Sequence, residues 1–193
     1  MVAAAVATQT GLNLVRPLTS YQIVELGGDG RMIGLVSAGY AVIPLVAVLW
    51  LGRLAERTRR LSALLAAEAA VLALGCVFLA LADGLLVVAL ASLLLGVAHV
   101  VITIAGQAAI ARFSPPDGLD RGFGRFTAGY ATGQLIGPLV GGAIPGTAAT
   151  RAARLELISP GMLVAAGFSL LSVPPLPTLL LSPPPCPARA HAV

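Results

Sequence analysis

GRLAERTRR, residues 52 to 60, lies between two long apolar runs in a chain of which only 10% of the residues are charged. Four of these residues are arginine, so the segment is the densest charge cluster of the sequence. A segment of this polarity between two membrane-length runs is predicted to be a loop in water. Because loops rich in arginine stay in the cytoplasm, it also sets the direction of every other span.

The composition of the whole chain indicates a membrane protein. The chain has 193 residues, 58% of them hydrophobic, and its mean hydropathy is +0.94. A soluble domain of this size cannot bury so much apolar surface, so the solvent of the folded chain is predicted to be lipid. Since one span takes roughly 20 apolar residues, there is room for about six helices joined by short loops.

The pattern of apolar runs predicts an all-α membrane protein with helices at residues 2–21, 33–51, 61–81, 85–111, 125–145 and 157–173. Residues 112–125 are predicted to be a second arginine-bearing loop on the cytoplasmic side. Arg151, Arg154 and Glu156 are predicted to lie in a loop on the opposite side. Residues 174–193 are rich in proline, which cannot continue a helix, so we expect a disordered tail. This topology places the N-terminus of a multi-pass plasma-membrane protein in the cytoplasm.

Several other classes of function find no support in the sequence. The net charge is +4 and all 12 basic residues are arginine, but most of them lie in loops on one side, which favours topology over a nucleic-acid partner. Cys76 lies in an apolar run and Cys186 in the tail, with neither a disulfide framework nor metal-ligand spacing. The motifs of serine hydrolases and zinc proteases are absent from the chain, so we expect neither an enzyme nor a bound cofactor or metal.

The arginine-rich segment resembles a known motif of the major facilitator superfamily, the loop between the second and third helices with the pattern Gly-x-Leu-Ala-Asp-Arg-x-Gly-Arg-Arg. The matching or related residues are Gly52, Leu54, Ala55, Glu56, Arg57, Arg59 and Arg60. Glu56 stands where the pattern has aspartate, and the second glycine is missing near Thr58. The alternative is an ordinary arginine cluster next to a membrane span.

Glycine recurs at every fourth residue of the fifth predicted helix, at positions 129, 133, 137 and 141. Positions four residues apart drift only about 40° around a helix, so these glycines form a stripe without side chains. In lipid, such a stripe lets two helix backbones approach closely. Pro138 lies within the stripe and removes one backbone donor.

The same helix resembles the fifth-helix signature of the superfamily, which is associated mainly with its drug and proton antiporters. The residues that match are Gly124, Gly133, Gly137, Pro138, Gly141 and Gly142. The resemblance implies that these residues control helix packing and are not catalytic. It covers roughly residues 10 to 145 and identifies the chain as similar to the N-terminal six-helix bundle of the family.

The resemblance implies a secondary transporter of small molecules, with an exporter as one form of it. Transporters of this family have two bundles of six helices and a substrate path between them. The sequence contains only the first bundle, so we expect either that it is a half separated from the second by truncation or a shifted reading frame, or that two copies pair. The expected partners are thus a second six-helix bundle or a second copy, beside the lipid bilayer. The alternative is a membrane fragment that does not transport.

Six polar residues within the predicted spans are candidates for a substrate or ion path: Asn13, Arg16, Glu68, His99, Gln107 and Gln134. Ionisable groups inside a membrane are costly and are functional candidates for that reason. Each has a structural alternative: Arg16 extending to the interface, Glu68 neutral or paired with an arginine, and His99 neutral and hydrogen-bonded. Proton-coupled members usually have an arginine four residues before a glycine of the fourth helix, but here Ser92 precedes Gly96, which argues against proton coupling.

Overall fold

The computed structural model describes residues 2–57, 61–146 and 150–171. Within these ranges lie six α-helices: α1 (Val2–Glu25), α2 (Gly30–Arg57), α3 (Leu61–Ala80), α4 (Leu85–Phe113), α5 (Leu119–Gly146) and α6 (Arg151–Leu170). A short 3-10 helix, η1 (Pro116–Gly118), precedes α5. No strand occurs in these ranges, and the predicted all-α fold is confirmed.

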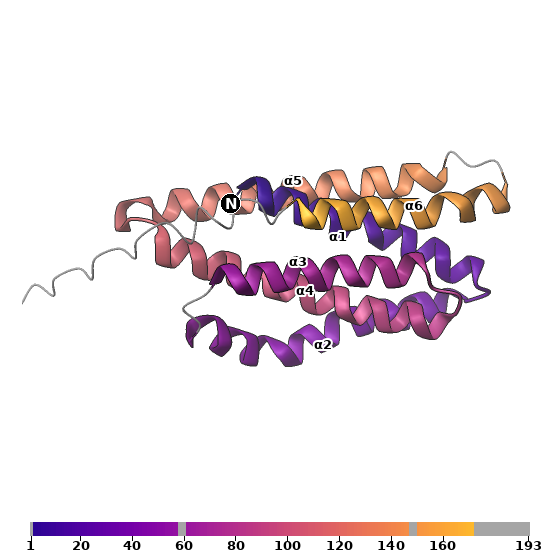
Figure 1. Cartoon of the computed structure of the whole chain (residues 1–193), viewed down its shortest axis with the longest axis horizontal. Helices are drawn as coiled ribbons and strands as arrows, with labels where there is room; N and C mark the ends of the chain where they lie inside the picture. The colour runs from indigo at the N-terminus through magenta and orange to yellow at the C-terminus, as the bar shows by residue number, and fades with distance from the viewer. Residues whose placement is uncertain (1, 58–60, 147–149, 172–193) are drawn as a thin grey trace, which may run out of the picture.

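The helices run roughly along the long axis of the molecule and pack into one bundle (Figure 1). Helix α1 packs against α5 and α6, α2 packs against α4, and α3 packs against both α4 and α6. Every residue from Thr8 to Val15 is buried, so neighbours cover all faces of this part of α1. The bundle is therefore built around α1, although α1 is not its most apolar helix.

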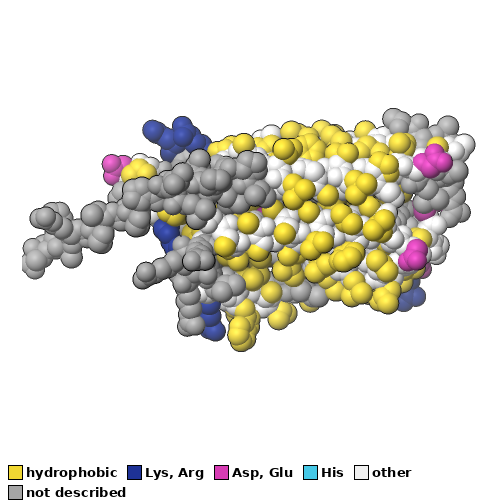
Figure 2. Space-filling model, viewed as in Figure 1, with side chains coloured by type: hydrophobic (Ala, Val, Ile, Leu, Met, Phe, Trp, Pro, Cys, Tyr) yellow, Lys and Arg dark blue, Asp and Glu magenta, His cyan; other side chains and the backbone are white. Residues whose placement is uncertain are grey.

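An apolar belt surrounds the middle of the bundle. Hydrophobic side chains cover this belt, whereas charged side chains gather toward the two ends (Figure 2). Among the described residues, Gly30–Arg53, Leu61–Ala80 and Leu85–Phe113 are long and apolar enough to cross a membrane, and Glu156–Leu170 is a shorter apolar helix. Helices α1 and α5 are less apolar because they carry buried polar residues and glycines. The belt is what a membrane protein requires.

Helix α5 lies along α1 with a row of glycines facing that helix. A Cβ atom added at Gly133 would lie 2.5 Å from the Cβ atom of Gln9, and one added at Gly137 would lie 2.7 Å from that of Asn13. Real Cβ atoms essentially never come so close. The two helices can therefore pack at this separation only because these positions have no side chain.

The other residues of the fifth-helix signature described above differ in the atoms that surround them. At Gly141 an added Cβ atom would collide with the Leu14 carbonyl group of α1, so this glycine shares the packed row. At Gly124 and Gly142 no atom lies within 4 Å of an added Cβ atom. Pro138 is exposed on the surface of the bundle. The motif thus has one face against α1 and another that the six helices leave uncovered.

The predicted loop at residues 52–60 is wrong in extent. Helix α2 continues beyond residue 51 and ends at Arg57, so the motif positions from Gly52 to Arg57 are helical. Leucine, alanine, arginine and glutamate are strong helix formers, and they outweigh the single glycine. Arg59 and Arg60 lie outside the described residues.

Two further loop predictions are also corrected. Within 112–125, α4 runs on to Phe113 and α5 begins at Leu119, which leaves only a short turn that includes η1. Helix α6 starts at Arg151, because the Thr150 hydroxyl group caps it by accepting a hydrogen bond of 3.2 Å from the Ala153 backbone N–H. The proline-rich tail predicted at 174–193 lies outside the described residues.

Candidate functional site

A close approach of α2 and α4 positions the first side chain of the site. Pro44 has no backbone N–H to donate to the carbonyl group of Tyr40, four residues earlier. This carbonyl group lies against Gly96 of α4, where an added Cβ atom would collide with it. The close contact brings the Tyr40 side chain to His99, one helical turn beyond Gly96.

His99 has a hydrogen-bond partner at each ring nitrogen. The Tyr40 hydroxyl group lies 2.9 Å from Nδ1, and the Tyr130 hydroxyl group of α5 forms a short hydrogen bond with Nε2. Both phenol rings meet the imidazole edge-on, with centroids 6.0 Å and 5.9 Å away. A neutral imidazole has one donor and one acceptor, so one tyrosine must donate its proton and the other must accept.

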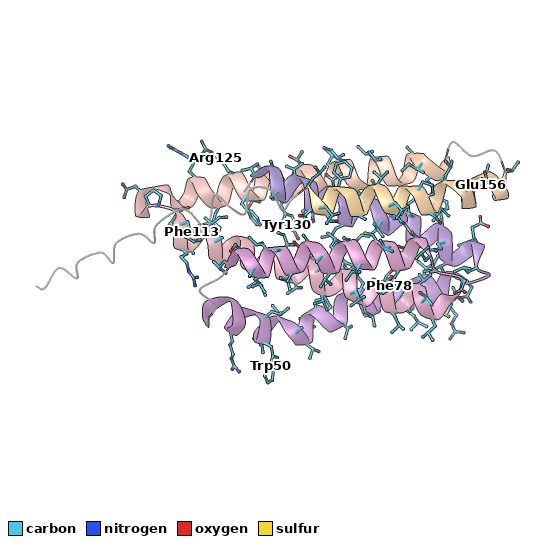
Figure 3. The ribbon with its side chains drawn as sticks, viewed as in Figure 1. Trp50, Phe78, Phe113, Arg125, Tyr130 and Glu156 are labelled. Atoms are coloured by element: carbon cyan, nitrogen blue, oxygen red, sulfur yellow. The ribbon has the colours of Figure 1, made fainter. Side chains whose placement is uncertain are left out.

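Thr103 extends this polar row along α4. Its hydroxyl group donates to the backbone carbonyl of His99 at 2.8 Å and lies 3.3 Å from the Tyr130 hydroxyl oxygen. In Figure 3, Tyr130 points from α5 into the bundle, whereas Trp50 of α2 points away from it. Three helices therefore contribute side chains to one connected group within the apolar belt.

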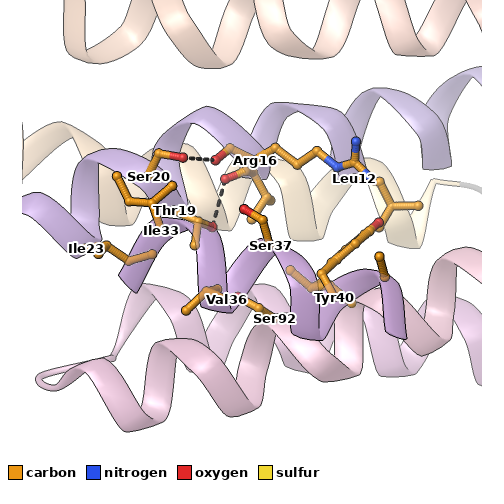
Figure 4. A pocket seen from close by; sticks show the side chains of 13 residues that line it. Leu12, Arg16, Thr19, Ser20, Ile23, Ile33, Val36, Ser37, Tyr40 and Ser92 are labelled. Carbon is orange, nitrogen blue, oxygen red and sulfur yellow. Dashed lines mark hydrogen bonds between the residues drawn. The ribbon is translucent and has the colours of Figure 1, made fainter. Parts of the chain in front are cut away.

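Arg16 of α1 lies at the other end of this row. Its guanidinium carbon is 4.7 Å from the centroid of the Tyr40 ring, which is a cation–π contact. The Arg16 side chain extends above this ring at the edge of a pocket (Figure 4). The described part of the chain provides no ion pair for Arg16. We call Arg16, Tyr40, His99, Thr103 and Tyr130 the polar row.

The pocket beside Arg16 has a volume of about 340 Å³ and lies between α1, α2 and α4. Apolar side chains such as Val15, Ile33 and Leu95 form much of its wall. Its polar lining consists of Arg16 and a set of hydroxyl groups, from Thr19, Ser20, Ser37, Tyr40 and Ser92. A concave, mostly apolar site with a few polar groups is the usual form of a small-molecule site.

The other path candidates are not part of the polar row. Asn13 is buried and donates hydrogen bonds from Nδ2 to the backbone oxygen and Oε1 of Gln9, at 2.9 Å and 3.1 Å. Gln134 is exposed on α5. Gln107 is also exposed and lines a different hollow, together with Arg112 and Phe123. The structure thus brings together Arg16 and His99 but leaves these three glutamine and asparagine side chains apart from them.

Glu68 is a buried carboxyl group in α3 with only 2% of its surface exposed. Neither of its carboxyl oxygens has a hydrogen-bond partner among the described residues. Helix α3 contributes no residue to the pocket beside Arg16. Within the described residues, no group of three or more histidine, cysteine, aspartate or glutamate side chains is placed to hold a metal ion.

Sequence reasoning missed Tyr40, Thr103 and Tyr130. A signal for the two tyrosines was present, because a tyrosine inside an apolar helix needs a partner for its hydroxyl group. The proline four residues after Tyr40 was a further sign of a local irregularity. The identity of the partner was not readable, since it depends on which faces of α2, α4 and α5 meet.

The family model described as Major Facilitator Superfamily matches residues 1–192. No curated protein matches the chain. The family match covers all of the helices described above.

Proposed function

The chain belongs to the major facilitator superfamily, and on this basis we propose that it moves a small molecule across the plasma membrane past the polar row. The observation that carries the proposal is the connected group of Arg16, Tyr40, His99 and Tyr130 within the apolar belt. Polar and ionisable groups are expensive in a membrane, and those that occur there usually belong to substrate or ion pathways.

The depth of the polar row supports this proposal. His99 lies fourteen residues after Leu85 and fourteen before Phe113, so it is the midpoint of α4. Secondary transporters bind their substrates near the middle of the bilayer, at the interface between two repeats. A polar row at half the length of the bundle is where such a site is expected.

We propose that the six helices act as one bundle of a two-bundle transporter. In this mechanism one bundle rocks against the other around a fixed site, which opens first to one side of the membrane and then to the other. The partner is a second six-helix bundle or a second copy of this chain. Export is the proposed direction, supported by the antiporter-like pattern of α5. The alternative is a bundle that folds but does not transport.

A transport assay tests the proposal. The full chain would be produced in cells that lack their own major exporters, and the retention of a panel of fluorescent small molecules would be measured. We expect lower retention of at least one compound with the chain than with an empty vector, and loss of this effect in His99→Ala. Phe78→Leu, at a half-exposed position of α3, is the matched control and should retain the effect.

Two results would contradict the proposed transport function. If no compound is exported, and cross-linking in the membrane detects neither a second copy nor another partner, the alternative of a non-transporting bundle holds. If export occurs but His99→Ala retains it, transport does not depend on the polar row.

A further inference from the structure

Arg16 is the one charged side chain among the residues that line the pocket between α1, α2 and α4. Its guanidinium group lies against the face of Tyr40, 4.7 Å from the ring centroid. Arg16 also has a side-chain hydrogen bond with Tyr40, but a guanidinium group has five N–H donors, so the others remain available. The described residues supply no carboxylate for this charge.

Most hydroxyl groups that line the pocket are less available than Arg16 as hydrogen-bond donors to a bound molecule. Thr19, Ser20 and Ser92 donate their protons to backbone oxygens of their own helices, at 2.9 Å, 3.3 Å and 2.8 Å. The Tyr40 hydroxyl group is held by His99. Ser37 also lines the pocket, but its hydroxyl group is neutral, so the charged donors that face the pocket belong to Arg16.

The acidic side chains that the structure describes lie elsewhere. Glu68, the buried one, belongs to α3, which does not line the pocket. Asp29 and Asp83 are exposed residues of the turns that join the helices. A cation with an apolar body would meet an arginine and no compensating carboxylate in this pocket, which disfavours its binding.

We infer that the molecule recognised beside Arg16 is a small organic anion, with a carboxylate or phosphate group on the guanidinium edge and an apolar body against Val15, Ile33 and Leu95. This inference rests on the proposed transport function and names the class of its substrate. Guanidinium groups pair with planar anions through two parallel hydrogen bonds. A pocket of about 340 Å³ is at the small end of the usual range for ligand sites.

The test uses three compounds of nearly equal shape: 3-phenylpropionate, 3-phenylpropanol and 3-phenylpropylamine. The purified full chain in nanodiscs of phosphatidylcholine would be placed in equilibrium dialysis with each. We expect saturable binding of the anion that is about tenfold or more tighter than that of the neutral or cationic compound. Equal or tighter binding of 3-phenylpropylamine would overturn the inference without any variant.

Variants of Arg16 test whether this residue causes the preference for the anion. Arg16→Gln should lose about tenfold or more of the affinity for 3-phenylpropionate, and Arg16→Lys should keep a part of it. Val24→Ala, an exposed position of the same helix outside the pocket, is the control and should bind as the wild type does. If Arg16→Gln does not fold, the affinity of Arg16→Lys and the comparison of the three compounds still test whether the pocket prefers an anion. Unchanged anion binding in a folded Arg16→Gln would contradict the proposal.

A lipid headgroup could supply the same chemistry, so nanodiscs with phosphatidylglycerol form a second arm. If this lipid stabilises the wild type but not Arg16→Gln, and 3-phenylpropionate does not bind, the anion is a lipid and the proposal of a soluble substrate is wrong. If the anion binds through Arg16 but is not transported into liposomes, the inference stands and the proposed function fails. If only neutral or cationic compounds are transported, the function stands and the inference fails.

Discussion

Two tyrosines hold His99 from opposite sides. Because each ring nitrogen has a phenol partner, the imidazole cannot rotate without breaking both hydrogen bonds. Three hydroxyl groups and one ring from α2, α4 and α5 thereby share one network. In the low-dielectric interior, the loss of one member leaves another polar atom unpaired, which costs more than the hydrogen bond itself.

Tyr130→Phe should therefore destabilise the chain by about 1–2 kcal/mol, because it leaves Nε2 of His99 without its partner. The free energy of unfolding in mixed micelles would measure this loss. Tyr40→Phe should cost a similar amount, and the two changes together should differ from the sum by at least about 0.5 kcal/mol, since both act through His99. Exact additivity would show that the ring does not couple the two tyrosines. Phe78→Leu should change stability by less than about 0.5 kcal/mol.

Glu68 gives a second prediction. A buried carboxyl group without a hydrogen-bond partner costs free energy in either protonation state. Glu68→Met has a similar volume and no polar atom, so we expect it to stabilise the chain by about 1 kcal/mol or more in the same assay. Glu156→Met, at an exposed position near the start of α6, should have little effect. A loss of stability in Glu68→Met would mean that the carboxyl group has a partner when the chain is in a membrane.

The sequence predicted individual polar residues but not their grouping. Arg16 and His99 were found because ionisable groups are conspicuous inside apolar runs. Their connection through Tyr40 depends on Gly96 and Pro44, which set the distance between α2 and α4. Such a contact joins positions far apart in the chain, and no local pattern records it.

Among whole helices, the pairing of α1 with α5 is the closest. The face of α5 toward α1 has few apolar side chains, but its glycines let α1 approach so that backbone meets backbone. In lipid this packing replaces the hydrophobic gain that would hold two helices together in water. The row of glycines is therefore expected to be sensitive to even a single added carbon atom.

A matched pair of glycine variants tests whether the contact between α1 and α5 is sensitive to an added carbon atom. Gly137→Ala places its Cβ atom 2.7 Å from that of Asn13 and 2.8 Å from the Thr10 backbone oxygen, so we expect a loss of about 1–3 kcal/mol. Gly142→Ala lies in the same helix with no atom within 4 Å of the added carbon. It should be neutral or stabilise by up to about 1 kcal/mol through helix propensity. The reverse order of the two variants in thermal unfolding would contradict this account of the α1–α5 contact.

The helices themselves were predictable, and their ends were less so. Apolar runs of membrane length gave the order of the six helices, because lipid demands such runs. The extension of α2 to Arg57 and the start of α5 at Leu119 were missed. Charged residues were taken as the end of each helix, but a helix can leave the membrane and continue in water when its residues are good helix formers.

The charges of the molecule as a whole are distributed unevenly between its ends. Arg53, Arg112, Arg121 and Arg125 lie at or near the end where α2 and α4 finish and α5 begins. Glu25, Asp29, Asp83 and Glu156 lie toward the opposite end, together with Arg31, and Asp117 and Asp120 lie near the first end, so both ends carry both signs but the described arginines are concentrated at the first. Arginine-rich segments remain in the cytoplasm during insertion. The concentration of arginine at one end supports the prediction that the N-terminus is cytoplasmic and that the opposite end faces outward.

Cysteine labelling in whole cells tests this orientation. Arg125 and Glu156 are exposed and lie toward opposite ends of the bundle (Figure 3), so each would be replaced by cysteine in a Cys76→Ala, Cys186→Ser background. A maleimide that cannot cross membranes should label Glu156→Cys in intact cells, and Arg125→Cys only after the cells are made permeable. The opposite pattern would place the arginine-bearing end outside and reverse the proposed topology. Labelling of both in intact cells would mean that the arginines at one end do not suffice to select a single direction of insertion.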